Sequence, residues 1–207
     1  MLEIKNTEVY GLERAIIASG NPMTVGEIDT TYKGAIEDRD FKRTKKLGSA
    51  ERGSGHDNFL SGITVYFDVK YPLYWSPEFQ RYHFFEIISS QSTMHRLTVM
   101  GKDENFENMF NKYVDKRSIE IVKEYINEYN KMLNYDEIPS EALYEAFMQV
   151  RSNLPSGFEM WMTIRTNYLQ LKTIYFQRRN HKLKEDWGAF CDWIEELPYF
   201  KEMVLKE

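Results

Sequence analysis

The sequence contains a single cysteine, Cys191, among its 207 residues. One thiol cannot form an internal disulfide, and it cannot supply a cysteine-rich zinc site. Cys191 stands between Phe190 and Trp193 in an apolar pattern, which favours packing over reactivity. The zinc-binding motifs HExxH and CxxC are also missing, so we expect neither a structural nor a hydrolytic zinc site.

Long hydrophobic runs are missing as well. No stretch of about 18 apolar residues occurs, so the sequence predicts no transmembrane helix. The first ten residues, MLEIKNTEVY, lack the basic and apolar regions of a signal peptide. From these absences we expect a cytoplasmic protein that does not bind membranes.

The sequence has no excess of basic residues. It contains 27 Lys and Arg against 32 Asp and Glu, which gives a net charge of −5. General binding to nucleic acid requires a basic face, so we do not expect nucleic acid as a partner. The motifs GxSxG, GxxxxGK[ST] and GxGxxG are all missing, which argues against the common serine-hydrolase, P-loop and dinucleotide-turn enzymes.

Aromatic residues, in contrast, are plentiful, at 15% of the chain. They supply large buried areas and surfaces for ring stacking. The length predicts one domain over residues 1–207, which is large enough to bury a core.

The hydrophobic pattern predicts two strands and several helices. Alternation predicts strands at 2–5 and 63–70, the second with Ile63, Val65, Phe67 and Val69 buried and Pro72 ending it. Helical spacing predicts helices at about 7–19, 76–96, 118–133, 140–151, 158–184 and 187–196. The mixture predicts an α+β fold, a helix-rich single domain around a small antiparallel or mixed sheet.

Residues 21–55 are charged and weakly patterned, so we expect a long loop there within the domain. The segment contains a basic cluster formed by Lys42, Arg43, Lys45 and Lys46. The cluster could approach a phosphate, and a solvated charged face is the alternative.

The stretch from Ser76 to Arg96 contains the densest group of candidate functional residues. Ser76, Pro77 and Glu78 together form a helix-start signal. Polar groups able to hold a phosphate and a heteroaromatic ring follow, and they are Arg81, His83, a Ser-Ser-Gln-Ser run at 89–92, His95 and Arg96. An amphipathic core helix with solvated polar residues is the alternative.

Two arginines further along the chain, Arg151 and Arg178, could recognise a phosphate through paired hydrogen bonds. On the expected helix at 158–184, Asn167 and Arg178 are about three turns apart and share a side, and His181 is adjacent to Arg178. This face could form a ligand wall that also includes Arg165 and Gln177, or it could be a solvated helix face.

The order of these motifs resembles that of the flavin-dependent thymidylate synthases. In that family a Gly-His pair and a strand precede a signature of the form RHRxxSxNExSxR, an R-x-x-L-P element and a helix bearing Asn and Arg. This sequence has, in the same order, Gly55-His56, ITVYFDV at 63–69, QRYHFFEIISSQSTMHR at 80–96, RSNLP at 151–155, and then Asn167 and Arg178. The resemblance covers roughly residues 1–190, and it implies the fold of that family.

Carried over by position, Arg81 matches the first Arg of the family's triplet, while Tyr82 and His83 replace its His and its second Arg. The family uses this triplet to hold FAD. The resemblance therefore implies cofactor binding by His56, Arg81, His83 and Asn167.

The second half of the signature has two registers. In the first, Ser89, Gln91 and Arg96 fit the family's Ser, Asn and Arg, and Ser92 replaces its Glu. In the second, Ser92 takes the place of the Ser beside the substrate, and Arg96 is lost from the frame. The residues to which the resemblance gives a substrate-binding role are Ser89, Gln91, Ser92, Arg96, Arg151 and Arg178. Among these, Arg178 is also the expected catalytic residue.

The resemblance implies reductive methylation of uracil C5. FAD would be the cofactor, a deoxyuridine nucleotide (dUMP) the substrate, and NADPH and methylenetetrahydrofolate the co-substrates, in a homotetramer. The altered triplet leaves two alternatives open. One is an inactive protein of this fold that binds nucleotides or proteins, and the other is a helical interaction protein without a ligand.

Overall fold

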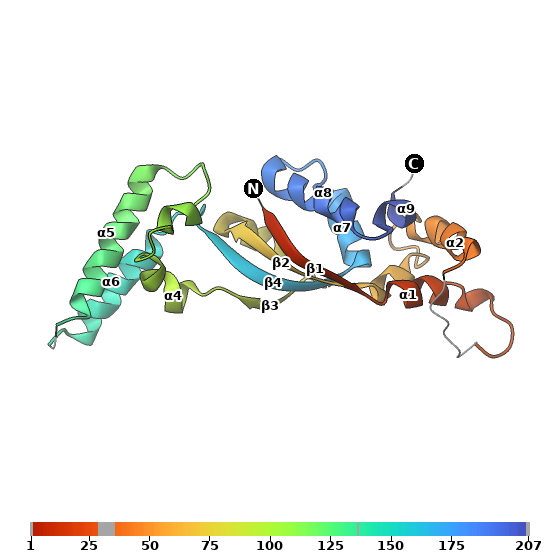
Figure 1. The fold of residues 1–207 in the computed structure, drawn as a ribbon, viewed down its shortest axis with the longest axis horizontal. Coiled ribbons are helices and arrows are strands. Elements are labelled where there is room, and N and C mark those ends of the chain that lie inside the picture. The colour runs from red at the N-terminus through yellow and green to blue at the C-terminus, as the bar shows by residue number, and fades with distance from the viewer. Residues whose placement is uncertain (1, 29–35, 136, 206–207) are drawn as a thin grey trace. The chain divides into compact units, whose positions relative to one another are not determined.

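The computed structural model describes residues 2–28, 36–135 and 137–205, in which helices outweigh strands (Figure 1). The chain divides into two compact units. The first comprises Met1–Val69, Phe79–Ile88 and Thr163–Glu207, and the second comprises Lys70–Glu78 and Ser89–Met162. The expectation of one domain over residues 1–207 stays a prediction.

The described strands form one antiparallel four-stranded sheet in the order β1-β2-β4-β3 (Figure 1). Their bounds are Glu3–Tyr10 (β1), Thr64–Pro72 (β2), Glu86–Ser90 (β3) and Glu159–Asn167 (β4). The expected alternation in the second strand is confirmed, because Val65, Phe67 and Val69 are buried and Pro72 is its last residue. The α+β, helix-rich class around a small sheet is therefore confirmed.

The first unit contains several helices besides its sheet residues. Their bounds are Leu12–Ala18 (α1), Asp38–Gly48 (α2), Tyr168–Arg178 (α7), Ala189–Glu196 (α8) and Phe200–Val204 (α9), with the single turns Asn21–Met23 (η1), Asn58–Gly62 (η2) and the π-helical Lys184–Gly188 (η5). Helix α7 packs against η2 and α8.

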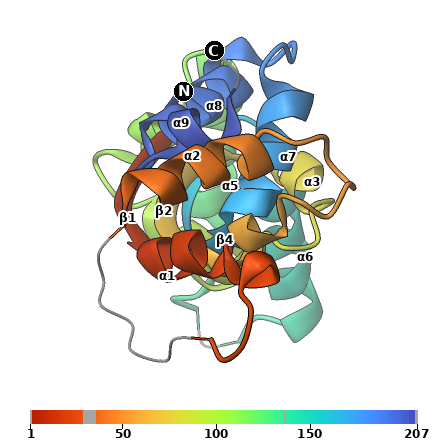
Figure 2. The ribbon, with the colours of Figure 1, turned by 90° about the vertical axis from the view of Figure 1, so that its right-hand side faces the viewer.

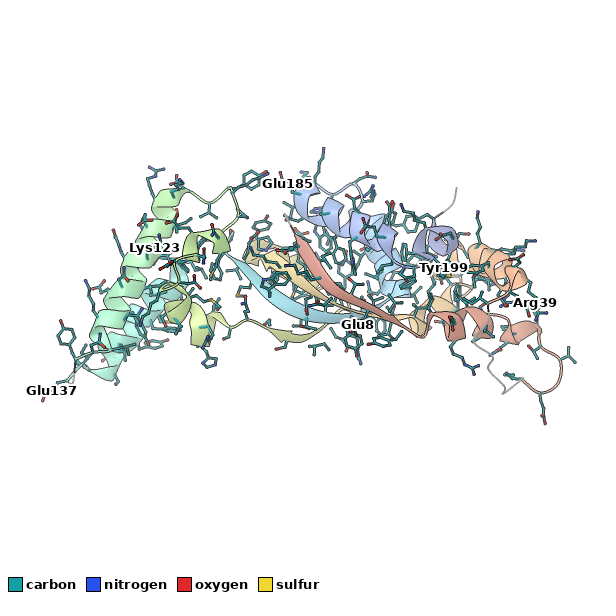
Figure 3. The ribbon with its side chains drawn as sticks, in the orientation of Figure 1. Glu8, Arg39, Lys123, Glu137, Glu185 and Tyr199 are labelled. Carbon is teal, nitrogen blue, oxygen red and sulfur yellow. The ribbon has the colours of Figure 1, made fainter. Side chains whose placement is uncertain are left out.

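Helices α2 and α9 lie side by side (Figures 1 and 2). A Cβ atom on Gly48, at the end of α2, would come within 2.4 Å of the Met203 carbonyl oxygen, so only glycine allows this approach. The ring of Tyr199, labelled in Figure 3, packs against that of Phe41 with the centroids 4.8 Å apart and the planes tilted by 58°. Backbone contact and ring packing together hold the two helices.

An aromatic cluster fills the core of the first unit. The Phe67 ring of β2 lies 6.0 Å from Phe85, 5.8 Å from Phe190 and 4.4 Å from Trp193, measured between centroids. Cys191 is fully buried beside this cluster on α8, which confirms its expected packing role. Burial raises the pKa of its thiol to about 11.

The second unit is mainly helical. It comprises Leu73–Trp75 (η3), Ser76–Phe79 (α3, whose last residue belongs to the first unit), Thr93–Met100 (α4), Phe106–Met109 (η4), Lys116–Met132 (α5) and Ser140–Ser152 (α6). Helices α5 and α6 lie side by side, and the ring centroids of Tyr129 and Phe147 are 6.0 Å apart (Figure 1). Both helices have buried apolar residues at helical spacing, namely Ile119, Val122, Ile126, Ala146 and Val150. On α5, Lys123, which is labelled in Figure 3, forms ion pairs with Glu107 and Glu120.

Two expected long helices are wrong. The stretch from Ser76 to Arg96 is helical only in α3 and, after strand β3, in α4. The segment at 158–184 begins as strand β4, in which Met160, Met162, Ile164 and Thr166 alternate as buried residues. In both segments strand pairing within the sheet overrides a local pattern that also fits a helix.

The N-terminal third also differs from expectation. Residues 7–10 extend β1 instead of opening α1, and α2 occupies Asp38–Gly48 within the segment expected as a loop at 21–55. Helix α2 begins with a reciprocal cap, in which the Glu37 side chain accepts from the backbone N–H of Asp40 while the Asp40 carboxylate accepts from that of Glu37. Its basic cluster therefore lies on a helix. Residues 29–35 of that segment lie outside the described residues.

Candidate functional site

The first unit contains a cavity of about 1020 Å³. Three segments form its walls, namely the loop before η2, the residues after α3, and one face of α7. The lining residues are Arg52, Gly53, Gly55, Asp57, Asn58, Arg81, Tyr82, His83, Phe84, Leu169, Gln170, Thr173, Gln177 and Arg178. A cavity of this size is sufficient for a ligand as large as a nucleotide.

The α7 wall begins at Asn167. The Asn167 side-chain oxygen accepts a hydrogen bond from the backbone N–H of Gln170 at 2.9 Å, so Asn167 is the N-cap of α7. Gln170, Thr173 and Gln177 follow at helical spacing and present polar side chains to the cavity from one face. The cap therefore fixes where this polar face starts.

A buried ion pair joins the α7 wall to the loop wall. The Lys172 ammonium lies 2.6 Å from the Asp57 carboxylate, and both side chains are 4% exposed. The same ammonium donates to the carbonyl oxygens of Gly48 at 2.8 Å and Ala50 at 2.6 Å. All three N–H donors of Lys172 thus have acceptors, and Asp57 is held by a charge of opposite sign.

Glycines shape the loop wall between Arg52 and Asp57. Gly53 and Gly55 have φ angles of +89° and +77°, which residues other than glycine rarely adopt. No atom lies within 4 Å of where a Cβ would stand on either residue. The cavity therefore meets bare backbone at these two positions.

Arg178 is the most constrained cation of the cavity. Its Nε donates to the Tyr82 hydroxyl at 2.8 Å, and the Tyr82 hydroxyl donates to the Gln177 side-chain oxygen at 3.2 Å. The guanidinium carbon lies 4.7 Å from the Trp187 ring centroid and 5.7 Å from that of Tyr82. Aromatic faces attract cations at such distances, so both rings stabilise the guanidinium.

Three arginines, Arg52, Arg81 and Arg178, come to this one cavity, together with His83. The one carboxylate among the lining residues, Asp57, is already paired with Lys172. The lining groups therefore carry a net positive charge, which favours anionic ligands such as phosphates. Phe84, which is 61% exposed, adds an aromatic surface for a planar ring.

Five of the predicted site residues lie in the first unit. Arg81, His83 and Arg178 line the same cavity. The prediction placed all three on helices, whereas in the structure Arg81 and His83 lie in an irregular segment after α3 and only Arg178 lies on a helix, α7. His56 is exposed between the lining residues Gly55 and Asp57 but is not itself part of the lining. Asn167 does not share a helix face with Arg178, because it caps α7.

The other predicted residues lie in the second unit. Gln91 continues the strand pairing, since its backbone N–H donates to the Trp161 carbonyl at 2.9 Å and its side-chain oxygen accepts from the Trp161 N–H at 3.0 Å. Ser92 caps α4, and Arg151 of α6 donates to Thr93 of α4 at 3.4 Å. Ser89, in β3, and Arg96, in α4, are exposed. Ser92, Arg96 and Arg151 thus come from two neighbouring helices of this unit.

The sequence prediction did not include several lining residues. Arg52 and Asp57 belong to no motif that the sequence shows, and Asp57 is held by Lys172, which lies 115 positions away. The polar face of α7 did leave a trace in the spacing of Gln170, Thr173 and Gln177. Arg165, which the prediction placed on the same helix as Arg178, lies in β4 and pairs with Glu86.

Within residues 2–28, 36–135 and 137–205, no group of three or more His, Cys, Asp or Glu side chains is arranged to hold a metal ion. In the same ranges, no helix is long and apolar enough to cross a membrane.

No protein-family model matches the chain, and no curated protein matches its sequence. Two solved structures of the flavin-dependent thymidylate synthase ThyX from Helicobacter pylori, both complexed with FAD and dUMP, do resemble it in fold. The first has a TM-score of 0.69 at 13% identity, covering 99% of this chain and 98% of that one. The second has a TM-score of 0.67 at 14% identity, covering 100% and 98%. At such identities the likeness establishes the fold.

Proposed function

We propose that this protein is a flavin-dependent thymidylate synthase-like enzyme that binds FAD and dUMP and reductively methylates uracil C5. The observation that carries the proposal is the cavity of the first unit. It gathers Arg52, Arg81 and Arg178 around an exposed aromatic ring, in a fold that matches proteins solved with FAD and dUMP along nearly the whole chain.

The lining residues suit such ligands. Both ligands carry phosphate groups, and arginines bind phosphate oxygens through paired, charge-assisted hydrogen bonds. Both also carry planar rings, for which Phe84 and Tyr82 provide surfaces. The cavity is large enough for one nucleotide or for part of a dinucleotide.

In this proposal Arg178 holds the substrate and polarises its uracil carbonyl, where negative charge develops during the reaction. Arg81 and His83 hold the cofactor, with His56 and Asn167 beside them. The flavin, when bound and reduced by NADPH, supplies the hydride, and methylenetetrahydrofolate supplies the carbon. No cysteine nucleophile is required, in agreement with the buried position of Cys191.

The remaining assignments depend on the order of the motifs alone. They give Ser89, Gln91, Ser92, Arg96 and Arg151 to the substrate. By the same argument we propose a homotetramer, and sedimentation of the purified protein tests the oligomeric state. We also propose that the protein is cytoplasmic.

A second candidate function is nucleotide binding without catalysis. The observation that favours it is the changed composition of the triplet at residues 81–83. Tyr82 and His83 stand where the family has His and Arg, and Tyr82 contacts Arg178. A pocket rebuilt in this way could keep the nucleotide and lose the flavin.

An absorbance spectrum of the purified protein, before and after addition of FAD, separates these functions. Flavin bands that remain with the protein after gel filtration support the enzyme, and thymidylate formation from dUMP then tests the activity. Binding of dUMP in titration calorimetry without any flavin would select the second function. A protein that binds neither ligand would contradict both.

A further inference from the structure

We propose that Tyr82 is the positioning residue of Arg178, and that its hydroxyl holds the guanidinium in the orientation that receives an anionic oxygen of the ligand. This inference deepens the proposed function and rests on it for the identity of the ligand.

The hydrogen bonds around Tyr82 have a fixed direction. Arginine can only donate, so the Tyr82 hydroxyl must accept from Arg178 Nε, at 2.8 Å. The single proton of the hydroxyl is then left for the Gln177 side-chain oxygen, at 3.2 Å. The chain from Arg178 through Tyr82 to Gln177 therefore uses the phenol as acceptor and donor at once, and each bond polarises the next.

Aromatic rings fix the guanidinium from its faces. Trp187 is fully buried, and its ring centroid lies 4.7 Å from the guanidinium carbon of Arg178. The rings of Tyr82 and Trp187 meet edge to face, 6.2 Å apart at 75°. Since Trp187 cannot move without disturbing the core, the position of the cation is set by the fold.

Trp187 lies in η5, the short π-helical turn between α7 and α8. Such turns are rare and often occur at functional sites. Here the turn carries the indole beside the last turn of α7, where Arg178 lies. Trp187 of η5 and Tyr82 thus both lie against the Arg178 guanidinium.

This arrangement favours ligand binding by reducing the loss of side-chain freedom. A free arginine side chain loses rotational freedom when it binds a ligand, and this loss weakens binding. Because Tyr82 and Trp187 already fix the guanidinium, less freedom is lost when the ligand arrives. Tyr82 also lines the cavity itself, so the held cation and its holder face the same ligand.

The first test measures dUMP affinity by titration calorimetry. Tyr82→Phe keeps the ring and removes the hydroxyl, and we expect dUMP affinity to fall about two- to tenfold, because the guanidinium is then ordered only when the ligand binds. Gln177→Leu removes the acceptor of the hydroxyl proton and should lower the affinity by a smaller factor. Tyr144→Phe, on an exposed tyrosine of α6, is the matched control and should bind as the parent does.

The decisive comparison uses double variants. If Tyr82 acts through Arg178, then Tyr82→Phe has no further effect once Arg178→Ala is present. Additive losses would overturn the proposal, because they would mean that Tyr82 binds the ligand by itself. Unchanged affinity in Tyr82→Phe alone would also overturn it. Circular dichroism and thermal unfolding of each variant identify any that do not fold.

A measurement without ligand separates this proposal from the proposed function. In the nitrogen-15 NMR spectrum, the Arg178 Nε–H signal is assigned by its disappearance in Arg178→Lys. We expect that signal to exchange slowly with water in the parent and quickly in Tyr82→Phe. Fast exchange in the parent would overturn the positioning role. Slow exchange in a protein that does not bind dUMP would keep the role and contradict the proposed function.

Discussion

At the scale of single residues, Arg178 is the side chain on which the proposed substrate site depends most. It lines the cavity from the last turn of α7. Removing one partner of a charge-assisted contact with phosphate costs about 1.5–3 kcal/mol. We therefore expect Arg178→Ala to weaken dUMP binding by roughly 10- to 150-fold in titration calorimetry, with the fold intact.

The neighbouring Arg179 provides the control for this experiment. It is the C-cap of the same helix, but it pairs with Asp192 and Glu195 of α8 and is not among the cavity's lining residues. Arg179→Ala should leave dUMP affinity unchanged. Equal affinities of the parent and Arg178→Ala would remove Arg178 from the site.

Lys172 gives a second prediction at this scale, about stability. Its substitution by Met would leave the Asp57 carboxylate buried without a cation and the Gly48 and Ala50 carbonyls without their donor. Breaking a buried pair in this way costs about 3–5 kcal/mol. We expect Lys172→Met to lower the free energy of unfolding in urea by that amount. The exposed Lys182→Met should change it little, and an equal effect in both variants would contradict a special role for the pair.

At the scale of elements, α7 depends on its cap. Asn167→Ala leaves the Gln170 N–H without its acceptor and should lower the free energy of unfolding by about 1 kcal/mol, whereas Asn167→Ser keeps an acceptor and should lower it less. The same pair of variants tests the proposed cofactor role. If Asn167 also binds FAD, both variants lose FAD affinity. If Asn167 is only a cap, FAD affinity in Asn167→Ser stays that of the parent.

The elements show what local pattern could and could not predict. Strand β2 and helices α5 and α6 were predicted correctly, because each has one buried face with a clear period. Strands β3 and β4 were predicted as helix. Ile87 and Ile88 of β3, like the buried residues of β4, adopt the strand conformation because they pair with neighbouring strands of the sheet, and the local sequence does not show this pairing. The start of α7 was hidden for the same reason, since Asn167 reads as a cap only once β4 is known to precede it.

At the scale of the whole molecule, the order of motifs was more informative than any one of them. The fold agrees with that of the compared ThyX structures along nearly the entire chain although only 13–14% of residues are identical. The fold is therefore shared although most individual side chains differ. The cavity shows the same division. Motif order led to Arg81, His83 and Arg178, whereas Arg52 belongs to no motif and Asp57 is placed by its long-range contact with Lys172.

The whole molecule should also lose stability at alkaline pH. Burial raises the pKa of Cys191 from 9.0 to about 11. Burial and the hydrogen bond to Glu195 raise that of Tyr175 to about 12. In each case the group loses its proton at lower pH in the unfolded state than in the folded state. The stability that the protonated group provides is therefore complete below pH 9, and it is lost as pH rises toward the pKa of the group in the folded state.

Cys191 lowers the stability at a lower pH than Tyr175 does, because its pKa in the unfolded state is the lower of the two. It should make the free energy of unfolding fall by about 1.4 kcal/mol per pH unit between pH 9 and pH 11. Urea unfolding at a series of pH values measures this slope, and Cys191→Ala should reduce it while leaving the decline due to Tyr175 at higher pH. An unchanged slope in the variant would mean that the thiol is not protected by burial. A thiol reagent provides an independent check, since native Cys191 should react at pH 8 only as fast as the protein unfolds.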